Sequence, residues 1–401
     1  VLLGVVTLAA LLSGLNRVAA EWRDTITGSL LIAVAIVNEF ALRRAARLAI
    51  RQSRSSAQDA SPHRRLVHPG DASMRRIIGI LTICGLMVGC GSTSTPSGRP
   101  RVGFIPKLVG IPYFNACKRG AEEAAAEVGL DLVYNGPTET DVNKQIDLVR
   151  QWTASGEFDV ICIACNEPDQ IAPALRDAQR RGIPVITYDA DTQPDARSFF
   201  VNQGTYDDVA REMVDSLAEQ LSPPGEGVVG ILTSSRQAPN QAEWAKRIRA
   251  YVAEKYPKLR LLEEAEHGED RDRGITVAKA MIGANPDLKG IIGLTSVAVP
   301  AAAEAVRQSG KKGQIRVGGV STPQDMRDYV KDGTVTEFVL WNPIDLGYLT
   351  VHVAHRQLKG EMPRTGTIRA GRLGEIKVRD GEVLLGKPMR FHKDNIDQFD
   401  F

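Results

Sequence analysis

From Arg101 to the end of the chain, short apolar runs rich in β-branched residues alternate with longer stretches that carry apolar residues at helical spacing. The short runs predict strands and the amphipathic stretches predict helices. The predicted strands cover residues 102–105, 132–134, 160–163, 185–187, 228–232, 260–263, 291–294, 316–319 and 335–340. The predicted helices cover residues 116–128, 143–154, 170–181, 206–220, 244–255 and 300–308.

Repeated alternation of strand and helix builds parallel sheets that helices cover on both faces. Roughly 300 residues follow Arg101, which favours two domains over one. A turn at residues 202–204 divides the series into two similar halves. The pattern therefore predicts two doubly wound α/β lobes, and in such sheets small ligands bind beyond the carboxyl ends of the strands.

Residues 74–90 have the order of parts of a bacterial lipoprotein signal peptide. Met74 is followed by two arginines, by an apolar run too short to span a membrane comfortably, and then by Cys90. In such signals the cysteine after the cleavage site is lipidated. Cys90 is therefore the predicted lipidation site, residues 91–100 would be a tether, and the mature protein would lie in the periplasm or at the outer face of the cytoplasmic membrane.

The residues before Met74 suggest a different protein. Two apolar runs, within residues 1–15 and 25–38, precede a group of arginines, which is typical of membrane segments with a cytoplasmic basic tail. Residues 1–50 resemble the C-terminal end of a sugar-importer permease. The first Met is Met74, so we expect the tail of one reading frame to have been joined to the next, with residues 51–73 as linker.

Composition and charge exclude several classes of function. The chain has 50 basic and 48 acidic residues, and its net charge of +2 gives no field that would gather nucleic acid. Cys162 and Cys165 form a Cys-x-x-Cys motif, but within a predicted strand their side chains would point to opposite faces. We therefore predict no redox or zinc pair, no other metal site and no cofactor.

Polar and aromatic residues follow the predicted strand ends in both halves. Carboxylate and amide oxygens accept hydroxyl hydrogens, an ammonium donates, and flat rings cover apolar C–H faces. Together they predict a site for a small polyhydroxylated ligand. The candidate residues at these ends are Lys107, Phe114, Asp189, Asn240, Gln241, Pro300, Trp341 and Asn342.

Signals for catalysis are weak. The sequence has neither a Gly-x-Ser-x-Gly elbow nor a Walker Gly-x-x-x-x-Gly-Lys motif. His352 and His355 share a helical face without a nearby acidic ligand pattern. Asp189 and Asp191 imitate the two carboxylates of a glycosidase, but we expect one of them to be structural. Trp152 and Trp244 lie on predicted helices and are interpreted as packing residues.

Six motifs resemble those of the autoinducer-2 receptors and rhamnose-binding proteins, which are periplasmic sugar-binding components of ABC importers. The resemblance covers residues 101–401. The motifs are FIPKLVG at 104–110, NGPTET at 135–140, RSFFVNQGT at 197–205, VPAAA at 299–303, GTVTEFVLW at 333–341 and KDNIDQFDF at 393–401.

This resemblance implies a two-lobed periplasmic binding protein that closes on its ligand about a hinge of three chain crossings. It implies a first lobe of residues 101–203 plus 341–368 and a second of 204–340 plus 369–401. It also implies ligand contacts at the residues of the cleft, with Asn240 where the autoinducer-2 receptor carries an aspartate. These implied contacts are Lys107, Asp189, Asn240, Gln241, Pro300 and Ala302.

The sequence thus predicts a binding protein, not an enzyme, that delivers a rhamnose-like deoxyhexose or autoinducer-2 to an ABC permease and its ATPase subunit. One alternative is a permease–receptor fusion in which residues 1–50 function in the membrane. Another is a ligand carrier for a chemoreceptor. LacI-type repressors share the fold, but they begin with a basic helix-turn-helix that the mature region lacks.

Overall fold

The computed structural model describes residues 98–401, which belong to the compact unit Thr93–Phe401. The predicted membrane segments at 1–50, the linker at 51–73 and the signal at 74–90 with Cys90 lie outside the described residues, as does most of the tether. Within residues 98–401, no helix is long and apolar enough to span a membrane.

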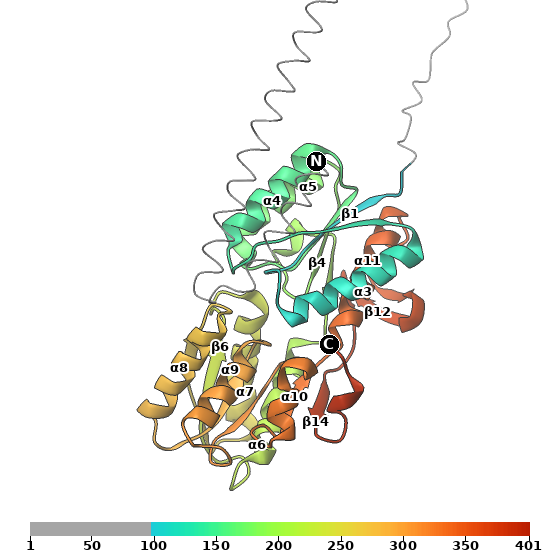
Figure 1. Cartoon of the computed structure of the whole chain (residues 1–401). Helices are drawn as coiled ribbons and strands as arrows, with labels where there is room; N and C mark the ends of the chain where they lie inside the picture. The colour runs from blue at the N-terminus through green and yellow to red at the C-terminus, as the bar shows by residue number, and fades with distance from the viewer. Residues whose placement is uncertain (1–97) are drawn as a thin grey trace, which may run out of the picture. The chain divides into compact units, whose positions relative to one another are not determined.

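The first lobe contains an eight-stranded sheet, which Figure 1 shows in its upper half. Strand pairs are parallel from β13 to β2 and antiparallel where β12 pairs with β11 and β13. The strand order is β11 (Gly366–Arg369), β12 (Glu375–Arg379), β13 (Glu382–Leu384), β5 (Phe199–Asn202), β4 (Val185–Tyr188), β3 (Val160–Ile163), β1 (Arg101–Ile105) and β2 (Asp131–Tyr134).

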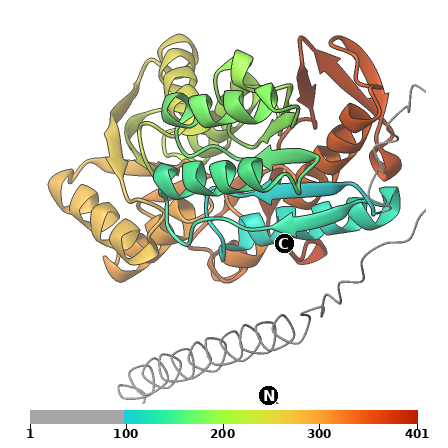
Figure 2. The ribbon, with the colours of Figure 1, turned by 90° about the horizontal axis from the view of Figure 1, so that it is seen from above.

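Helices cover both faces of this sheet (Figure 2). Helices α3 (Pro112–Val128) and α11 (Pro343–Leu358) pack together on one face, and α4 (Val142–Ser155) and α5 (Pro168–Arg180) pack together on the other. Each begins with Pro or follows a residue whose side chain caps the first turn, such as Asp141 before α4.

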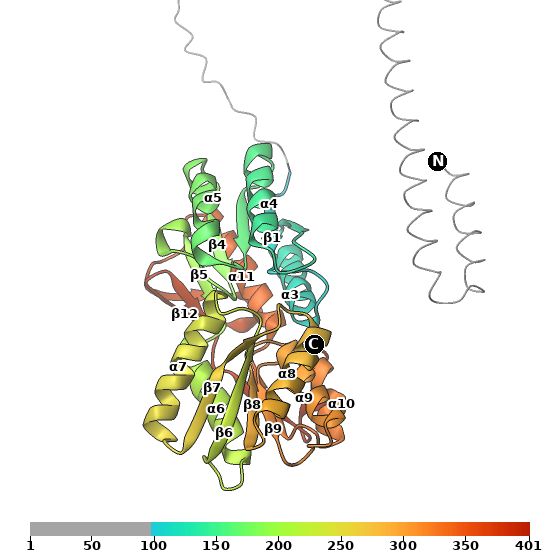
Figure 3. The same ribbon diagram turned by 90° about the vertical axis from the view of Figure 1, so that its left-hand side faces the viewer.

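The second lobe contains a four-stranded parallel sheet between two helix layers (Figure 3). Strand β10 (Glu337–Leu340) lies beside β9 through a bridge from Val320 to Val339, and it pairs antiparallel with β14 (Met389–His392). The sheet order is β7 (Leu259–Glu266), β6 (Gly227–Thr233), β8 (Leu288–Gly293) and β9 (Arg316–Gly319). Helices α6 (Tyr206–Gln220) and α7 (Pro239–Lys255) form one layer, and α8 (Arg271–Ala284), α9 (Ala298–Gln308) and α10 (Pro323–Lys331) form the other.

The chain passes between the two lobes three times. The first crossing follows β5 and the second lies between β10 and α11 at Trp341. The third lies between β13 and β14, later than the expected boundary at 368/369. Residues 369–401 therefore do not all belong to the second lobe: β13 pairs in parallel with β5, so β12 and β13 extend the first sheet, and that part of the prediction is wrong.

Two glycines allow α3 and α11 to cross closely. A Cβ atom at Gly120 would lie 1.8 Å from the Ile344 carbonyl oxygen, and one at Gly347 would lie 1.9 Å from the Cys117 carbonyl oxygen. No side chain fits at such distances, so the backbones touch directly. Tyr113 and Phe114 are buried in the first turn of α3.

The two faces of the first sheet have separate apolar cores. Cys162 belongs to the core beneath α3 and α11, whereas Cys165 belongs to the core beneath α4 and α5, where Trp152 stacks on Phe158. Both cysteines are buried and free. The prediction that their side chains point to opposite faces is confirmed, as is the packing role of Trp152.

Candidate ligand-binding site

A cavity of about 40 Å³ lies between the lobes, at the carboxyl ends of strands from both sheets. The first lobe and the crossing at Trp341 contribute mainly aromatic rings, one lysine and one aspartate. The second lobe contributes amides, hydroxyls, a glutamate and apolar side chains. The lining residues are Lys107, Ile111, Tyr113, Phe114, Asp189, Asn240, Gln241, Trp244, Glu269, Leu294, Thr295, Ser296, Val320, Leu340 and Trp341.

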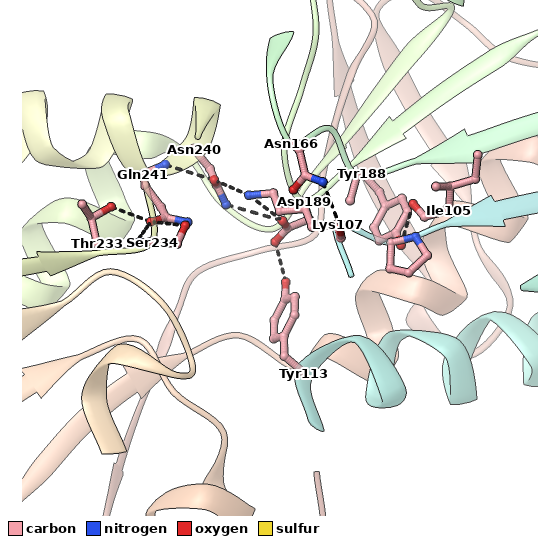
Figure 4. A network of polar contacts seen from close by, with 12 residues as sticks. Ile105, Lys107, Tyr113, Asn166, Tyr188, Asp189, Thr233, Ser234, Asn240 and Gln241 are labelled. Atoms are coloured by element: carbon pink, nitrogen blue, oxygen red, sulfur yellow. Dashed lines mark hydrogen bonds and ion pairs between the residues drawn. The ribbon is translucent and has the colours of Figure 1, made fainter. Parts of the chain in front are cut away.

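Lys107, Asp189 and Asn240 form a polar network across this cavity (Figure 4). The Nζ atom of Lys107 donates to Oδ1 of Asn240 at 2.8 Å and lies 3.6 Å from Oδ2 of Asp189. The Nδ2 atom of Asn240 lies 3.5 Å from the same Asp189 oxygen. All three side chains are buried, so the ammonium, the carboxylate and the amide are presented to a ligand with little competition from water.

The backbone on either side of the network is held in place by buried amides. Nδ2 of Asn166 donates to the carbonyl oxygen of Lys107 at 2.9 Å, which fixes the segment after β1. Oε1 of Gln241 accepts hydrogen bonds from Oγ1 of Thr233 at 2.6 Å and from the backbone N–H of Ser234 at 2.8 Å. Gln241 therefore orders the turn between β6 and α7 as well as lining the cavity.

Asp189 has an unusual conformation and environment. It follows β4 with φ of +61°, a left-handed conformation that is uncommon for a residue with a side chain and often marks functional sites. Its Oδ1 accepts a hydrogen bond from the Tyr113 hydroxyl at 2.8 Å. Burial raises the pKa of Asp189, and the nearby Lys107 ammonium and Tyr113 hydroxyl offset this only in part.

The neighbouring carboxylate of Asp191 is structural, as the sequence analysis expected for one of this pair. It makes hydrogen bonds with Arg197 at 2.8 to 3.0 Å through both of its oxygens and accepts one from Oγ1 of Thr187 at 2.6 Å. Both oxygens of Asp191 therefore accept hydrogen bonds from Arg197 and Thr187, and Asp191 does not line the cavity.

An aromatic wall encloses one side of the cavity. Nε1 of Trp341 donates to the Tyr113 hydroxyl at 2.9 Å, and the two rings meet edge to face with centroids 6.0 Å apart. Trp244 lies 5.7 Å from Trp341 between ring centroids, and Phe114 lies 5.1 Å from Tyr113. Rings of this kind can cover the C–H face of a sugar.

The second lobe adds a carboxyl group and hydroxyls that the sequence analysis missed. Glu269 precedes α8, and Thr295 and Ser296 follow β8. Oγ1 of Thr295 also accepts from the backbone N–H of Ala298 at 3.0 Å, so it caps the start of α9. The signal for Thr295 and Ser296 was their position after a strand end, where the sequence analysis had chosen Pro300 and Ala302 instead, and it had named no residue after the strand that precedes Glu269.

Three of the predicted site residues do not line the cavity. Pro300 and Ala302 are buried within α9, which begins at Ala298 and not at Pro300. Oδ1 of Asn342 accepts from the backbone N–H groups of Ile344 at 3.0 Å and Asp345 at 3.4 Å, and thereby caps α11. Trp244, interpreted as a packing residue, is buried and also lines the cavity. The other six residues all line the cavity: Lys107, Phe114, Asp189, Asn240, Gln241 and Trp341.

Two α/β lobes, joined by three crossings and enclosing a buried polar and aromatic cavity, define a two-lobed solute-binding protein. The periplasmic binding protein domain model matches residues 102–362, and the chain belongs to that family. It is 27% identical to the D-ribose/D-allose-binding protein of Pseudomonas aeruginosa over 274 residues, which are 65% of this chain and 84% of that relative.

Two solved structures are similar over most of the described fold. The LsrB protein of Clostridium saccharobutylicum in complex with AI-2 has 25% identity and a TM-score of 0.72, covering 75% of this chain and all of its own. An ABC transporter solute-binding protein of Clostridium phytofermentas with bound L-rhamnose has 26% identity and a TM-score of 0.71, covering 75% of this chain and 98% of its own.

These findings confirm the family expected from the sequence motifs. The protein belongs to the sugar-binding components of ABC transporters, which work with a permease, and membership implies a periplasmic location. The relatives are sugar-binding transport proteins and not enzymes. Within residues 98–401, no group of three or more His, Cys, Asp or Glu side chains is placed to hold a metal ion.

Proposed function

We propose that this protein captures a small polyhydroxylated sugar, a rhamnose-like deoxyhexose in preference to autoinducer-2, and delivers it to an ABC permease and its ATPase subunit. The observation that carries the proposal is the buried network of Lys107, Asp189 and Asn240, which joins groups from both lobes. Hydroxyl groups of a ligand that enters between the lobes would exchange with these contacts, and closure of the lobes would then depend on the ligand.

Asn240 supports the preference for a deoxyhexose. Its Oδ1 accepts from Lys107 and its Nδ2 faces Asp189, so the side chain both donates and accepts. An aspartate at this position would bring a second negative charge toward Asp189 and could only accept. A pyranose, with a ring oxygen and alternating hydroxyls, suits the mixed pattern better. The methyl group of a deoxyhexose would lie against Phe114 or Trp341.

The relatives offer several ligand classes for comparison. One is named for D-ribose and D-allose, and the two solved structures hold AI-2 and L-rhamnose. The direct test is native mass spectrometry of the protein as purified from its own host, followed by calorimetric titration with L-rhamnose, D-ribose, D-allose and AI-2. Tighter binding of AI-2 than of any of the three sugars would contradict the preference, and binding of none of the four ligands would contradict the proposed function.

The signal-like order of residues 74–90 supports attachment of the mature protein to the membrane through acyl chains on Cys90. A single acyl chain binds a membrane only marginally, whereas several chains on one residue hold firmly. Two alternatives have distinct outcomes. Peptides from residues 1–50 in the mature protein would favour the permease–receptor fusion, and ligand-dependent binding to a chemoreceptor without import would favour the carrier role.

A further inference from the structure

Glu269 is a carboxyl group of the cavity without a counter-ion of its own. It lies between β7 and α8 and lines the cavity from the second lobe. Its Oε2 atom is buried and has no hydrogen-bond partner among the described residues. Its φ of +59° is a left-handed conformation, which is costly for a residue with a side chain and is often retained at ligand sites.

The charged groups that face Glu269 are engaged elsewhere. The Lys107 ammonium favours ionisation of Glu269, but its contacts are with Asn240 and Asp189, and the negative charge of Asp189 opposes ionisation of Glu269. The hydroxyls of Thr295 and Ser234 favour ionisation but carry no charge.

Neither His267 nor Arg271, which lie on the same segment as Glu269, supplies a cation to it. His267 is neutral because burial lowers its pKa to about 4. Asp270 caps α8 by accepting from the backbone N–H of Arg273 at 2.8 Å. The guanidinium of Arg271 donates to the Tyr329 hydroxyl at 3.0 Å.

Burial raises the pKa of Glu269 to about 7, and the Lys107 ammonium and the hydroxyls of Thr295 and Ser234 offset this only in part. Protonated and ionised forms are then present in comparable amounts at neutral pH. The ionised form only accepts hydrogen bonds, and its two oxygens match two neighbouring hydroxyl groups of a sugar. Two such charge-assisted bonds would stabilise the ionised form in the complex.

We propose that Glu269 is a further ligand-binding residue, which accepts two hydroxyl hydrogens from a vicinal diol of the ligand and makes affinity rise with pH across neutrality. This inference rests on the proposed function as a sugar-binding protein. Below neutral pH the carboxyl proton leaves to solvent when the diol binds, so ligand binding and proton release are linked.

The test is calorimetric titration of the wild type, Glu269→Gln and Glu263→Gln at pH 5.5, 6.5, 7.5 and 8.5. The probe is whichever of L-rhamnose, D-ribose and D-allose binds the wild type most tightly. Glu263→Gln is the matched control, because Glu263 lies on the adjoining β7 with its side chain 85% exposed. Glutamine keeps the size of Glu269 but not its charge, and thermal unfolding establishes that each variant is folded.

We expect wild-type affinity to rise by roughly tenfold or more between pH 5.5 and 7.5. Glu269→Gln should bind at least roughly tenfold more weakly at pH 7.5 and show little change with pH, whereas Glu263→Gln should follow the wild type. Titration of the wild type at pH 6.5 in buffers of different ionisation enthalpy should also reveal proton release, a measurement that does not depend on any variant.

The outcomes separate the two proposals. If none of the three sugars binds the wild type, the proposed function fails and this inference fails with it. If a sugar binds but Glu269→Gln keeps the wild-type affinity and pH profile, only the role of Glu269 is wrong. Wild-type affinity that falls as pH rises, or sugar binding at pH 6.5 without proton release, would also overturn that role alone.

Discussion

The ammonium of Lys107 and the amide oxygen of Asn240, 133 positions apart in the chain, meet at 2.8 Å in the cavity. Lys107 belongs to the first lobe and Asn240 to the second, so this contact bridges the two lobes, and Nζ of Lys107 lies 3.6 Å from Oδ2 of Asp189. A ligand that displaces this contact would find a donor in the Lys107 ammonium of the first lobe and an acceptor in the Asn240 amide oxygen of the second lobe.

Asp189 should contribute more to the free energy of ligand binding than any other single side chain of the cavity. Hydrogen bonds to a charged group contribute about 1.5 to 3 kcal/mol each, so loss of two in Asp189→Ala should weaken sugar binding by at least roughly a hundredfold. Calorimetry with the natural ligand measures this. Asp191→Asn is the matched control: it should lower the melting temperature through loss of the Arg197 pair and leave affinity within threefold. A similar, small effect on affinity for both variants would remove Asp189 from the site.

Asn240→Asp should shift ligand preference from a deoxyhexose toward AI-2. The change replaces a group that donates and accepts with one that only accepts, and it adds a negative charge beside Asp189. Polar groups left unpaired by the wrong ligand are costly, so a change of about 1 to 3 kcal/mol in relative affinity is expected. Titration of L-rhamnose and AI-2 against both proteins measures the ratio of affinities. An unchanged ratio would mean that Asn240 does not select the ligand.

Gly347→Ala should destabilise the first lobe. The new methyl group would lie 1.9 Å from the Cys117 carbonyl oxygen, so α3 and α11 must move apart at an expected cost of about 1 to 3 kcal/mol or more. Gly283→Ala is the control, because Gly283 lies in α8 with no atom within 4 Å of the added Cβ, and alanine should there be neutral or stabilising by up to about 1 kcal/mol. Denaturant unfolding measures the stability of both variants. Equal changes in their free energies of unfolding would mean that the crossing of α3 and α11 accommodates the added methyl group.

Glu269 should also make the stability of the ligand-free protein depend on pH. Its pKa is about 7 in the folded protein and about 4.5 in the unfolded chain, so the folded state binds the proton more tightly. The stabilising contribution of the protonated form is complete below about pH 4.5 and is lost as pH rises to about 7. Relative to wild type, Glu269→Gln should therefore gain about 1 to 3 kcal/mol of unfolding free energy across this range. Parallel stability profiles for the two proteins would show that the carboxyl group is paired in solution.

Cys90 is predicted to be the first residue of the mature protein and the site of lipid attachment. Cys90→Ser should abolish acylation and leave either soluble or unprocessed protein, because the cysteine after the cleavage site is the residue that is lipidated. Fractionation of cells and mass spectrometry of the N-terminal peptide test this. Persistence of the variant in membranes, together with peptides from residues 1–50, would instead support the fusion.

The sequence by itself determined most of the alternating elements. Each predicted strand and helix overlaps an observed one, because β-branched runs and amphipathic spacing are local properties. Its predicted helix ranges leave out α8, α10 and α11, although it expected a helical face at His352 and His355; in α11 every residue from Leu346 to Ala354 is buried, so no polar face marks that stretch. It also missed β5, a short fully buried strand that follows closely after β4.

The positions of the predicted strand ends were enough to select four residues that line the cavity, Lys107, Asp189, Asn240 and Gln241, since the carboxyl ends of parallel strands meet at one edge of a sheet. Only the tertiary structure decided the rest of the site and the third crossing. Trp244 reaches the cavity because α7 begins at Pro239, one turn earlier than its pattern suggests, and Glu269 enters from a loop without periodicity. Likewise, β13 joins the first sheet by pairing with β5, which lies far away in sequence, and β12 follows by pairing with β13. Contacts of this kind depend on where distant segments meet, and no local pattern of residues encodes that.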